Sequence, residues 1–352
     1  MPPSEDESPS VSVIVPARNE ALNIERCVRS LLSSEYPEFE VVVVNDRSED
    51  DTLAILKRLA KKDERLVIVN GAEKPADWAG KPWACWQGFS KSVGDLLLFT
   101  DADTEHGPLL LGRAVSLLRS ERADLVSVMP LQEMKSFWER LVQPFFLLLL
   151  GLRYGSPQRM SRNTNPRDAI ANGQFILVTR DSYQWIGGHK KVHSSIIEDL
   201  QLAAAYTDNG KVLRFAVADR DMKTRMYRSA RDLVEGWSKN TFVGMMHTVG
   251  TPMLASLAMV TTMLVQAVIF LGPIAAIATG TLLTIQTMLA FGIAAWAGGT
   301  LLIGAILVSA KENPLWALFH PLGALMQLRI FSRALVRGTR GIEWKGRQYN
   351  IG

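Results

Sequence analysis

The feature that constrains this chain most is a stretch of 71 residues, from residue 240 to residue 310, that contains no Asp, Glu, Lys or Arg. As a single helix it would be about 105 Å long at ~1.5 Å per residue, far longer than a bilayer is thick. Because Gly272-Pro273 interrupts the stretch, we predict two spans, near 253–272 and 283–308, that form a transmembrane hairpin within 241–310. The alternative is a pair of helices buried inside a soluble protein.

The segment that follows, 311–352, carries seven Lys or Arg residues against two acidic ones. A hairpin returns the chain to the side that it left, so the positive-inside rule places this basic segment in the cytosol. We therefore predict a multi-pass protein of the inner (cytoplasmic) membrane, with its N-terminal domain facing the cytoplasm. The net charge of +4 is too small to indicate a nucleic-acid partner. Cys27 and Cys85 form no disulfide framework, which fits a reducing compartment.

Three other segments lie outside the hairpin. Residues 138–152 are apolar but too short to span and include Pro144, so we predict an interfacial helix there. Residues 314–336 are long enough to span but include two arginines, and we predict an interfacial or re-entrant helix followed by a cytosolic tail. A third span is the alternative. Residues 1–10 are acidic and rich in Pro and Ser, which predicts a disordered leader and no signal peptide.

Between residues 11 and 240, short β-branched or apolar runs alternate with amphipathic helical patterns. The runs are 11–15, 40–44, 65–69, 95–99, 124–128 and 175–178. Continuous apolar strands separated by helices predict an α/β domain with a mostly parallel sheet, in which ligands bind where the strands end. No G-x-G-x-x-G motif follows the first run, and Gly80-Lys81 lacks the rest of a P-loop. These two absences disfavour a dinucleotide-binding Rossmann domain and a P-loop nucleotide site.

Asp101 and Asp103 follow the fourth run with one residue between them. In an extended segment, residues i and i+2 point the same way, so both carboxylates can approach one cation. Mg²⁺ and Mn²⁺ prefer such oxygen ligands and commonly bind through one or two carboxylates together with substrate phosphates. The alternative is a pair of solvated aspartates at a strand end.

Five motifs occur in one order along the chain: PARNE (16–20), VNDRSED (44–50), GKPWA (80–84), FTDADT (99–104) and IEDLQLA (197–203). Together they resemble the family 2 glycosyltransferases, over roughly residues 11–240. The resemblance implies a GT-A fold, the nucleotide-diphospho-sugar transferase domain with a Rossmann-like, mostly parallel sheet. The segments RMYRSARDLVEGWSKN (225–240) and WKGRQY (344–349) are similar to the membrane-bound, lipid-modifying members. These are the ceramide glucosyltransferase-like, hopanoid-associated and carotenoid-glycosylating enzymes.

The resemblance also implies roles for individual residues. It assigns Asp103 as the direct metal ligand and Asp199 as the catalytic base. The residues that it places against the nucleotide-sugar are Pro16, Ala17, Glu20, Asp46, Lys81, Asp101, Arg228 and Arg231, with Lys81 near the diphosphate. The residues that it places on the acceptor side are Asn172, Gly173 and Gly188. Arg228-x-x-Arg231 is the best match to the family's Gln/Arg-x-x-Arg-Trp motif, but Asp232 stands where the Trp would be. This departure favours single-sugar transfer over processive synthesis.

These residue types suit the implied chemistry. A divalent ion on Asp103 can neutralise the diphosphate that leaves the sugar. A carboxylate at Asp199 can remove the proton of an attacking hydroxyl. The apolar periodicity after Asp199 predicts that it lies in the first turn of a helix, where the helix dipole favours the ionised form.

The sequence therefore predicts an inverting, metal-dependent hexosyltransferase that uses Mg²⁺ or Mn²⁺. It would move one sugar from a nucleotide-sugar, a UDP-sugar, to the hydroxyl of a membrane lipid. One alternative is a polyprenyl-phosphate glycosyltransferase, and another is a catalytically silent, membrane-anchored nucleotide-binding module. A transporter is disfavoured because the two predicted spans contain no ionisable residue.

Overall fold

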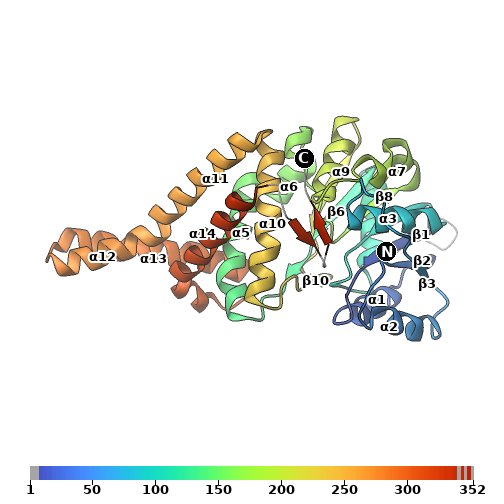
Figure 1. The fold of residues 1–352 in the computed structure, drawn as a ribbon, viewed down its shortest axis with the longest axis horizontal. Helices are drawn as coiled ribbons and strands as arrows, with labels where there is room; N and C mark the ends of the chain where they lie inside the picture. Colours follow the sequence, from blue (N-terminus) through green and yellow to red (C-terminus); the bar gives the residue numbers. More distant parts are fainter. Residues whose placement is uncertain (1–7, 339–341, 345–346, 350–352) are drawn as a thin grey trace. The chain divides into compact units, whose positions relative to one another are not determined.

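The computed structural model describes residues 8–338, 342–344 and 347–349, the last two ranges as backbone only. By internal packing the chain divides into two units (Figure 1). Unit 1 comprises Met1–Gln132 and Tyr154–Arg225, and unit 2 comprises Glu133–Arg153 and Met226–Gly352. Of the predicted disordered leader, residues 1–7 lie outside the described part of the chain, as do residues 339–341, 345–346 and 350–352 of the predicted tail.

A seven-stranded sheet forms the centre of unit 1 (Figure 1). In spatial order its strands are β3 (Leu66–Asn70), β2 (Phe39–Asn45), β1 (Val11–Ala17), β4 (Leu96–Phe99), β8 (Ile176–Thr179), β6 (Leu125–Met129) and β9 (Leu213–Val217). All neighbours are parallel except β8, which is antiparallel to both β4 and β6. The predicted α/β class and mostly parallel sheet are confirmed. The direction of β8 was not predictable, because a four-residue apolar run indicates burial but not direction.

Helices cover this sheet and connect its strands. They are α1 (Ile24–Leu32), α2 (Thr52–Ala60), α3 (Gly80–Lys91), α4 (Leu110–Ser120), α6 (Pro157–Arg162), η2 (Pro166–Asp168), α7 (Arg180–Ile186), α8 (Gly188–Lys191) and α9 (Glu198–Asp208). A small sheet of β5 (Thr104–His106), β10 (Met222–Thr224) and β7 (Leu131–Gln132) completes the unit. Valines on one face of β1 and β2 pack with apolar residues of α1, α2 and α4 in a single core. This core fixes the strand ends from which the polar loops emerge.

Unit 2 is mostly helical in its described residues, with a two-stranded antiparallel sheet of β11 (Ile342–Trp344) and β12 (Arg347–Tyr349). Its helices are α5 (Phe137–Tyr154), α10 (Ala230–Val249), α11 (Pro252–Gln266), η3 (Ala267–Leu271), α12 (Gly272–Leu282), α13 (Gln286–Ser309), η4 (Pro314–Phe319) and α14 (His320–Arg337). A helix is therefore present at the predicted position 138–152, and its interfacial location stays a prediction. Helix α10 runs across residue 240, where we place the domain boundary, and the proposed domain extents also stay predictions.

Two helices of the described chain are long and apolar enough to cross a membrane. The first, Pro252–Leu282, is 31 residues long with a mean hydropathy of 2.1, and the second, Gln286–Ser309, has 24 residues and a mean hydropathy of 2.0. Helices α12 and α13 lie against each other so closely that a Cβ added to Gly292 would be 2.8 Å from the Ile277 nitrogen. The pair can therefore form the predicted hairpin.

The predicted break at Gly272-Pro273 is wrong. Helix continues through this pair, and the chain turns instead at residues 283–285, where Thr284 has a φ of 56°. The physical reason lies in η3, a π-helical turn that ends directly before Gly272. A proline lacks the N–H that an α-helix requires, and a locally wider turn accommodates the lost bond without ending the helix.

Candidate functional site

The loops that follow β1 and β2 lie side by side because these strands are parallel neighbours. The N–H of Asp46 donates to the Ala17 carbonyl at 2.8 Å, and Asp46 itself is buried. Arg18 ties the two loops together, because one guanidinium nitrogen donates to the carbonyls of both Asp46 and Arg47 at 2.9 Å. The structure therefore brings the predicted residues Ala17 and Asp46 together. Arg18 was missed, although its place inside the PARNE motif was a usable signal.

The other two predicted residues of the first motif have local partners. Pro16 lies within β1 and is paired in register with Val44 of β2. The Glu20 carboxylate accepts from the Asn23 side chain at 2.9 Å, and the backbone N–H of Glu20 donates to the Thr52 hydroxyl at 2.8 Å. Glu20 therefore contributes to the connection that leads into α1, and its predicted contact with a nucleoside stays a prediction.

The D-x-D pair lies on a turn between β4 and β5. The Thr104 hydroxyl donates to the Asp101 carbonyl at 2.7 Å and closes this turn. The expected extended segment is wrong, because residues 102–103 form a turn, and the shared approach of Asp101 and Asp103 to one cation stays a prediction. The Asp103 carbonyl accepts from Arg26 at 3.2 Å, which ties the turn to α1.

A buried polar cluster supports this turn from behind. The His106 ring nitrogen Nε2 lies 3.0 Å from the hydroxyls of both Thr100 and Thr104. Burial lowers the pKa of His106 to about 3, so the ring is neutral near pH 7. The Cys27 thiol lies 3.6 Å from the Asp101 carbonyl oxygen. Cys27 and Cys85 are both free and buried, as expected for a chain without disulfides.

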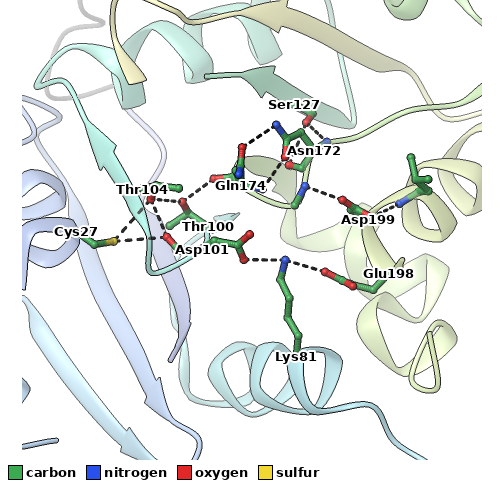
Figure 2. A network of polar contacts seen from close by, with 12 residues as sticks. Cys27, Lys81, Thr100, Asp101, Thr104, Ser127, Asn172, Gln174, Glu198 and Asp199 are labelled. Carbon is green, nitrogen blue, oxygen red and sulfur yellow. Dashed lines mark hydrogen bonds and ion pairs between the residues drawn. The ribbon is translucent and has the colours of Figure 1, made fainter. Parts of the chain in front are cut away.

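Lys81 connects the D-x-D turn to the start of α9 (Figure 2). It comes from the first turn of α3, and its Nζ lies 2.7 Å from Asp101 Oδ1 and 2.8 Å from Glu198 Oε1. Burial opposes the charge on Lys81, but Asp101, Glu198 and Asp199 outweigh this effect and hold its pKa well above the usual value. Lys81 is therefore a cation bound by two carboxylates, and its expected place near a diphosphate stays a prediction. Glu198 is a partner that the sequence did not single out.

Asp199 lies in the first turn of α9, as predicted. Its Oδ2 accepts from the Gly173 N–H at 3.0 Å, and its Oδ1 accepts from the Leu200 N–H at 2.8 Å (Figure 2). Burial raises the pKa of Asp199 to about 6, the charge of Glu198 adds to this shift, and Lys81 opposes it. The shift is opposite to the one expected from the helix dipole. A carboxylate with this pKa is mostly ionised at neutral pH and is a stronger base than an exposed one.

The Asn172-Gly173-Gln174 turn is held by two strands of the sheet (Figure 2). The Asn172 N–H donates to the Ser127 hydroxyl of β6 at 2.8 Å, and the Thr100 hydroxyl after β4 donates to the Gln174 carbonyl at 2.7 Å. The turn presents the Gly173 N–H to Asp199. The structure thus brings the predicted acceptor-side residues Asn172 and Gly173 to the predicted base.

Gly188, Arg228 and Arg231 are the remaining predicted residues. Gly188 has a φ of 49° and packs against the ring of Tyr183, whose hydroxyl accepts the His189 N–H at 3.0 Å. This is a structural reason for glycine at position 188. Arg228 and Arg231 belong to unit 2, where they are exposed at the start of α10. Their predicted phosphate role stays a prediction.

Comparison with known proteins identifies the family. The model of the family described as "Glycosyl transferase family 2" matches residues 12–187, half of the chain. The chain belongs to this family. It is a glycosyltransferase with the GT-A fold, as the five motifs predicted.

Relatives and a solved structure agree with this assignment. The 4,4'-diaponeurosporenoate glycosyltransferase of Staphylococcus haemolyticus is 30% identical over 239 residues, 67% of this chain and 62% of the relative. The Staphylococcus aureus protein of the same name is 30% identical over 242 residues, 67% of this chain and 61% of the relative. The matched part thus spans about three fifths of the length of these relatives. A mannosyltransferase from Pyrobaculum calidifontis, solved with GDP-Man and Mn²⁺, has a TM-score of 0.57 at 20% identity. That comparison covers 94% of this chain and 87% of the other.

The carboxylates of this glycosyltransferase fit a metal that is shared with a substrate. Within the described residues, no group of three or more His, Cys, Asp or Glu side chains could hold a metal ion. A site built from one or two carboxylates and substrate phosphates needs no such group. The carboxylates of Asp101, Glu198 and Asp199 all act on the cation of Lys81, so negative charge exceeds positive charge around this ammonium group. A divalent cation would complement this excess.

Proposed function

We propose that this family 2 glycosyltransferase moves a single sugar from a nucleotide-sugar to the hydroxyl of a membrane lipid, with inversion at the sugar carbon. The observation that carries the proposal is the environment of Asp199. This carboxylate is partly buried, accepts two backbone N–H bonds and has a pKa raised to about 6. Such a group is suited to remove a proton from a hydroxyl as it attacks. Lys81 binds both Asp101 of the D-x-D turn and Glu198, the neighbour of Asp199 in α9. In this proposal the nucleotide-sugar binds at that turn.

The proposed metal is Mg²⁺ or Mn²⁺, held by Asp103 with Asp101 nearby. When bound, such an ion would neutralise the negative charge of the leaving diphosphate. The remaining work falls to the chain itself. The nucleoside would be held by Asp46, Pro16, Ala17 and Glu20. Lys81 would balance the charge of Asp101. Arg228 and Arg231 would pair with phosphate oxygens. We propose a UDP-sugar, and the GDP-Man in the solved mannosyltransferase makes GDP-sugars the first comparison.

The proposed acceptor is a lipid because of the two apolar helices in unit 2. Of their most apolar windows, 22% and 28% is buried, so most of this surface is left for a bilayer. The two relatives are named for the glycosylation of 4,4'-diaponeurosporenoate, which supports an acceptor other than a polysaccharide. We place the enzyme in the inner (cytoplasmic) membrane, multi-pass, with unit 1 and its site in the cytoplasm. A polyprenyl phosphate is disfavoured, because an acceptor that is already an anion needs no base at Asp199.

The test is sugar transfer from radiolabelled UDP- and GDP-sugars into a total lipid extract from the source cells, with Mn²⁺ or Mg²⁺ and with or without chelator. Asp199→Asn should lower the transfer rate by about 100-fold or more, the usual range for loss of a general base. The matched control is Asp208→Asn, at the exposed far end of the same helix, which should transfer at the wild-type rate. Chelator should abolish labelling by the wild type. Label that persists in Asp199→Asn would exclude a hydroxyl acceptor activated by this residue.

A further inference from the structure

Gly173 occupies a position where any side chain would meet two site residues. Its N–H donates to Asp199 Oδ2 at 3.0 Å. A Cβ added to it would lie 2.7 Å from Lys81 Nζ and 3.2 Å from Asp199 Oδ2, both closer than side chains normally approach. Its φ lies outside the left-handed region, so the backbone conformation does not require glycine. The requirement is therefore for space beside Lys81 and Asp199.

The turn around Gly173 is not free to move away from a larger residue. Asn172 is tied to Ser127 of β6, and Gln174 is tied to Thr100 after β4. Within the turn, the Gln174 N–H donates to Asn172 Oδ1 at 3.1 Å. Ser127 and Thr100 are themselves fully buried. The end of a long side chain is easier to displace than a turn held at both ends, so an added methyl group would displace the Lys81 ammonium.

Lys81 cannot move without a consequence for the site. Its Nζ is bound by Asp101 on one side and by Glu198 on the other, at 2.7 and 2.8 Å. Glu198 precedes Asp199 in α9, so displacement of Lys81 disturbs the helix turn that carries the proposed base. The contact of the same methyl group with Asp199 Oδ2, at 3.2 Å, is the milder of the two, so the larger effect should come through Lys81.

We propose that Gly173 is a positioning residue of this enzyme, whose N–H orients the Asp199 carboxylate and whose missing side chain lets Lys81 join Asp101 to Glu198 beside it. The proposal rests on the proposed function in one respect, the role of Asp199 as the base. It adds that a side chain at position 173 would displace Lys81 from its place between Asp101 and Glu198.

A double-mutant cycle tests this pairing in the full-length protein. Its four members are the wild type, Gly173→Ala, Lys81→Ala and the double variant. Gly173→Ala should lower kcat by about 100-fold in the presence of Lys81, since a displacement near 1 Å can cost that much. In the Lys81→Ala background the same change should cost less than about fivefold, because contacting residues are not additive. The matched control is Gly112→Ala in α4, where a Cβ would meet only Tyr36 Cδ2 at 3.9 Å, and kcat should not change.

Equal factors in the two backgrounds would overturn the proposal, because a purely structural role for Gly173 is indifferent to Lys81. The melting temperature of the same proteins provides a readout without activity. Gly173→Ala should lower it in the presence of Lys81 and leave it nearly unchanged in the Lys81→Ala background. If the wild type transfers no sugar, the proposed function fails. The melting temperatures of the four proteins still test the positioning role of Gly173. If Gly173→Ala does not fold, the double variant should, and its failure to fold would also overturn the proposal.

Discussion

The two units differ in how their least exposed polar side chains are paired. In unit 1, Lys81, Glu198 and Asp199 are charged groups that are at least partly withdrawn from solvent, and the Lys81 cation is enclosed by carboxylates. In unit 2, the buried Glu139 carboxylate accepts from the N–H groups of Lys135 and Ser136, and two helices are joined by a neutral amide pair, in which Gln266 Nε2 donates to Gln327 Oε1 at 2.5 Å. An unpaired charge costs several kcal/mol in an apolar interior, whereas a neutral amide costs about 1–3. Unit 1 retains costly groups because they are the chemistry that we propose.

The largest effect is expected when a charged side chain is introduced into an apolar helix of unit 2. Leu301, in the second candidate span, is 75% exposed. If its surroundings are lipid, Leu301→Arg should cost about 2.5–3.5 kcal/mol, roughly a 100-fold loss of correctly inserted protein. The measurement is the amount of full-length protein in the membrane fraction. The matched control is Val336→Arg in α14, outside the two candidate spans and 90% exposed, which should have little effect.

The outcome distinguishes lipid from water around α13. An arginine on a surface in contact with water costs almost nothing. Equal amounts of Leu301→Arg and Val336→Arg in the membrane fraction would therefore show that Leu301 does not face lipid. In that case the contrast between the units would reflect local packing alone.

In unit 1, the ionisation of Asp199 predicts how the transfer rate depends on pH. Because its pKa is raised to about 6, the transfer rate should fall tenfold per pH unit below about pH 6, as the base becomes protonated. Glu198→Gln removes a charge that contributes to this shift, so the acidic limb should move to lower pH. The measurement is kcat against pH for the two proteins. A limb that stays in place in Glu198→Gln would mean that another group controls the rate.

The same shift has a consequence for stability. The folded-state pKa of Asp199 is raised from 3.8 to about 6, so the folded state binds this proton more tightly than the unfolded chain does. The contribution to stability is present below pH 3.8 and is lost as the pH rises through about 6. Ionised Asp199 thus opposes folding at neutral pH, which is a cost that a purely structural residue would not carry.

Much of unit 1 could be predicted from the sequence, because its signals are local. Each predicted apolar run overlaps a strand, and the periodicity after Asp199 placed it in the first turn of α9. The motifs predicted which loops carry polar side chains, since parallel strands bring their ends to one edge.

The details that escaped prediction depend on contacts between distant segments. The partners of Lys81 are 20 and 117 positions away in sequence, so no spacing rule could have paired it with Asp101 or Glu198. The need for glycine at position 173 likewise comes from the approach of α3 and α9 to one turn. In unit 2, Pro273 is a strong local signal for a break, and the π-helical turn before it overrides that signal.

The smallest expected effect concerns the amide pair of unit 2. Gln266 is 5% exposed and Gln327 is fully buried, and each has one further side-chain atom without a hydrogen-bond partner among the described residues. Gln327→Leu would leave the Gln266 amide unpaired, so it should lower the free energy of unfolding by about 1 kcal/mol, the lower end of the range for a buried polar group. The double variant Gln266→Leu/Gln327→Leu should recover most of that loss, because removal of both partners leaves no unpaired amide.

Thermal unfolding of the detergent-solubilised proteins measures both effects. A double variant that loses the sum of the two single losses would show that the amides contribute independently and not as a pair. The corresponding change in unit 1 cannot be neutral, because removal of Lys81 leaves Asp101 and Glu198 without the cation that binds both. The neutral pair of unit 2 should thus be replaceable by apolar residues with little loss of stability, whereas the charges of unit 1 are retained for the sugar transfer that we propose.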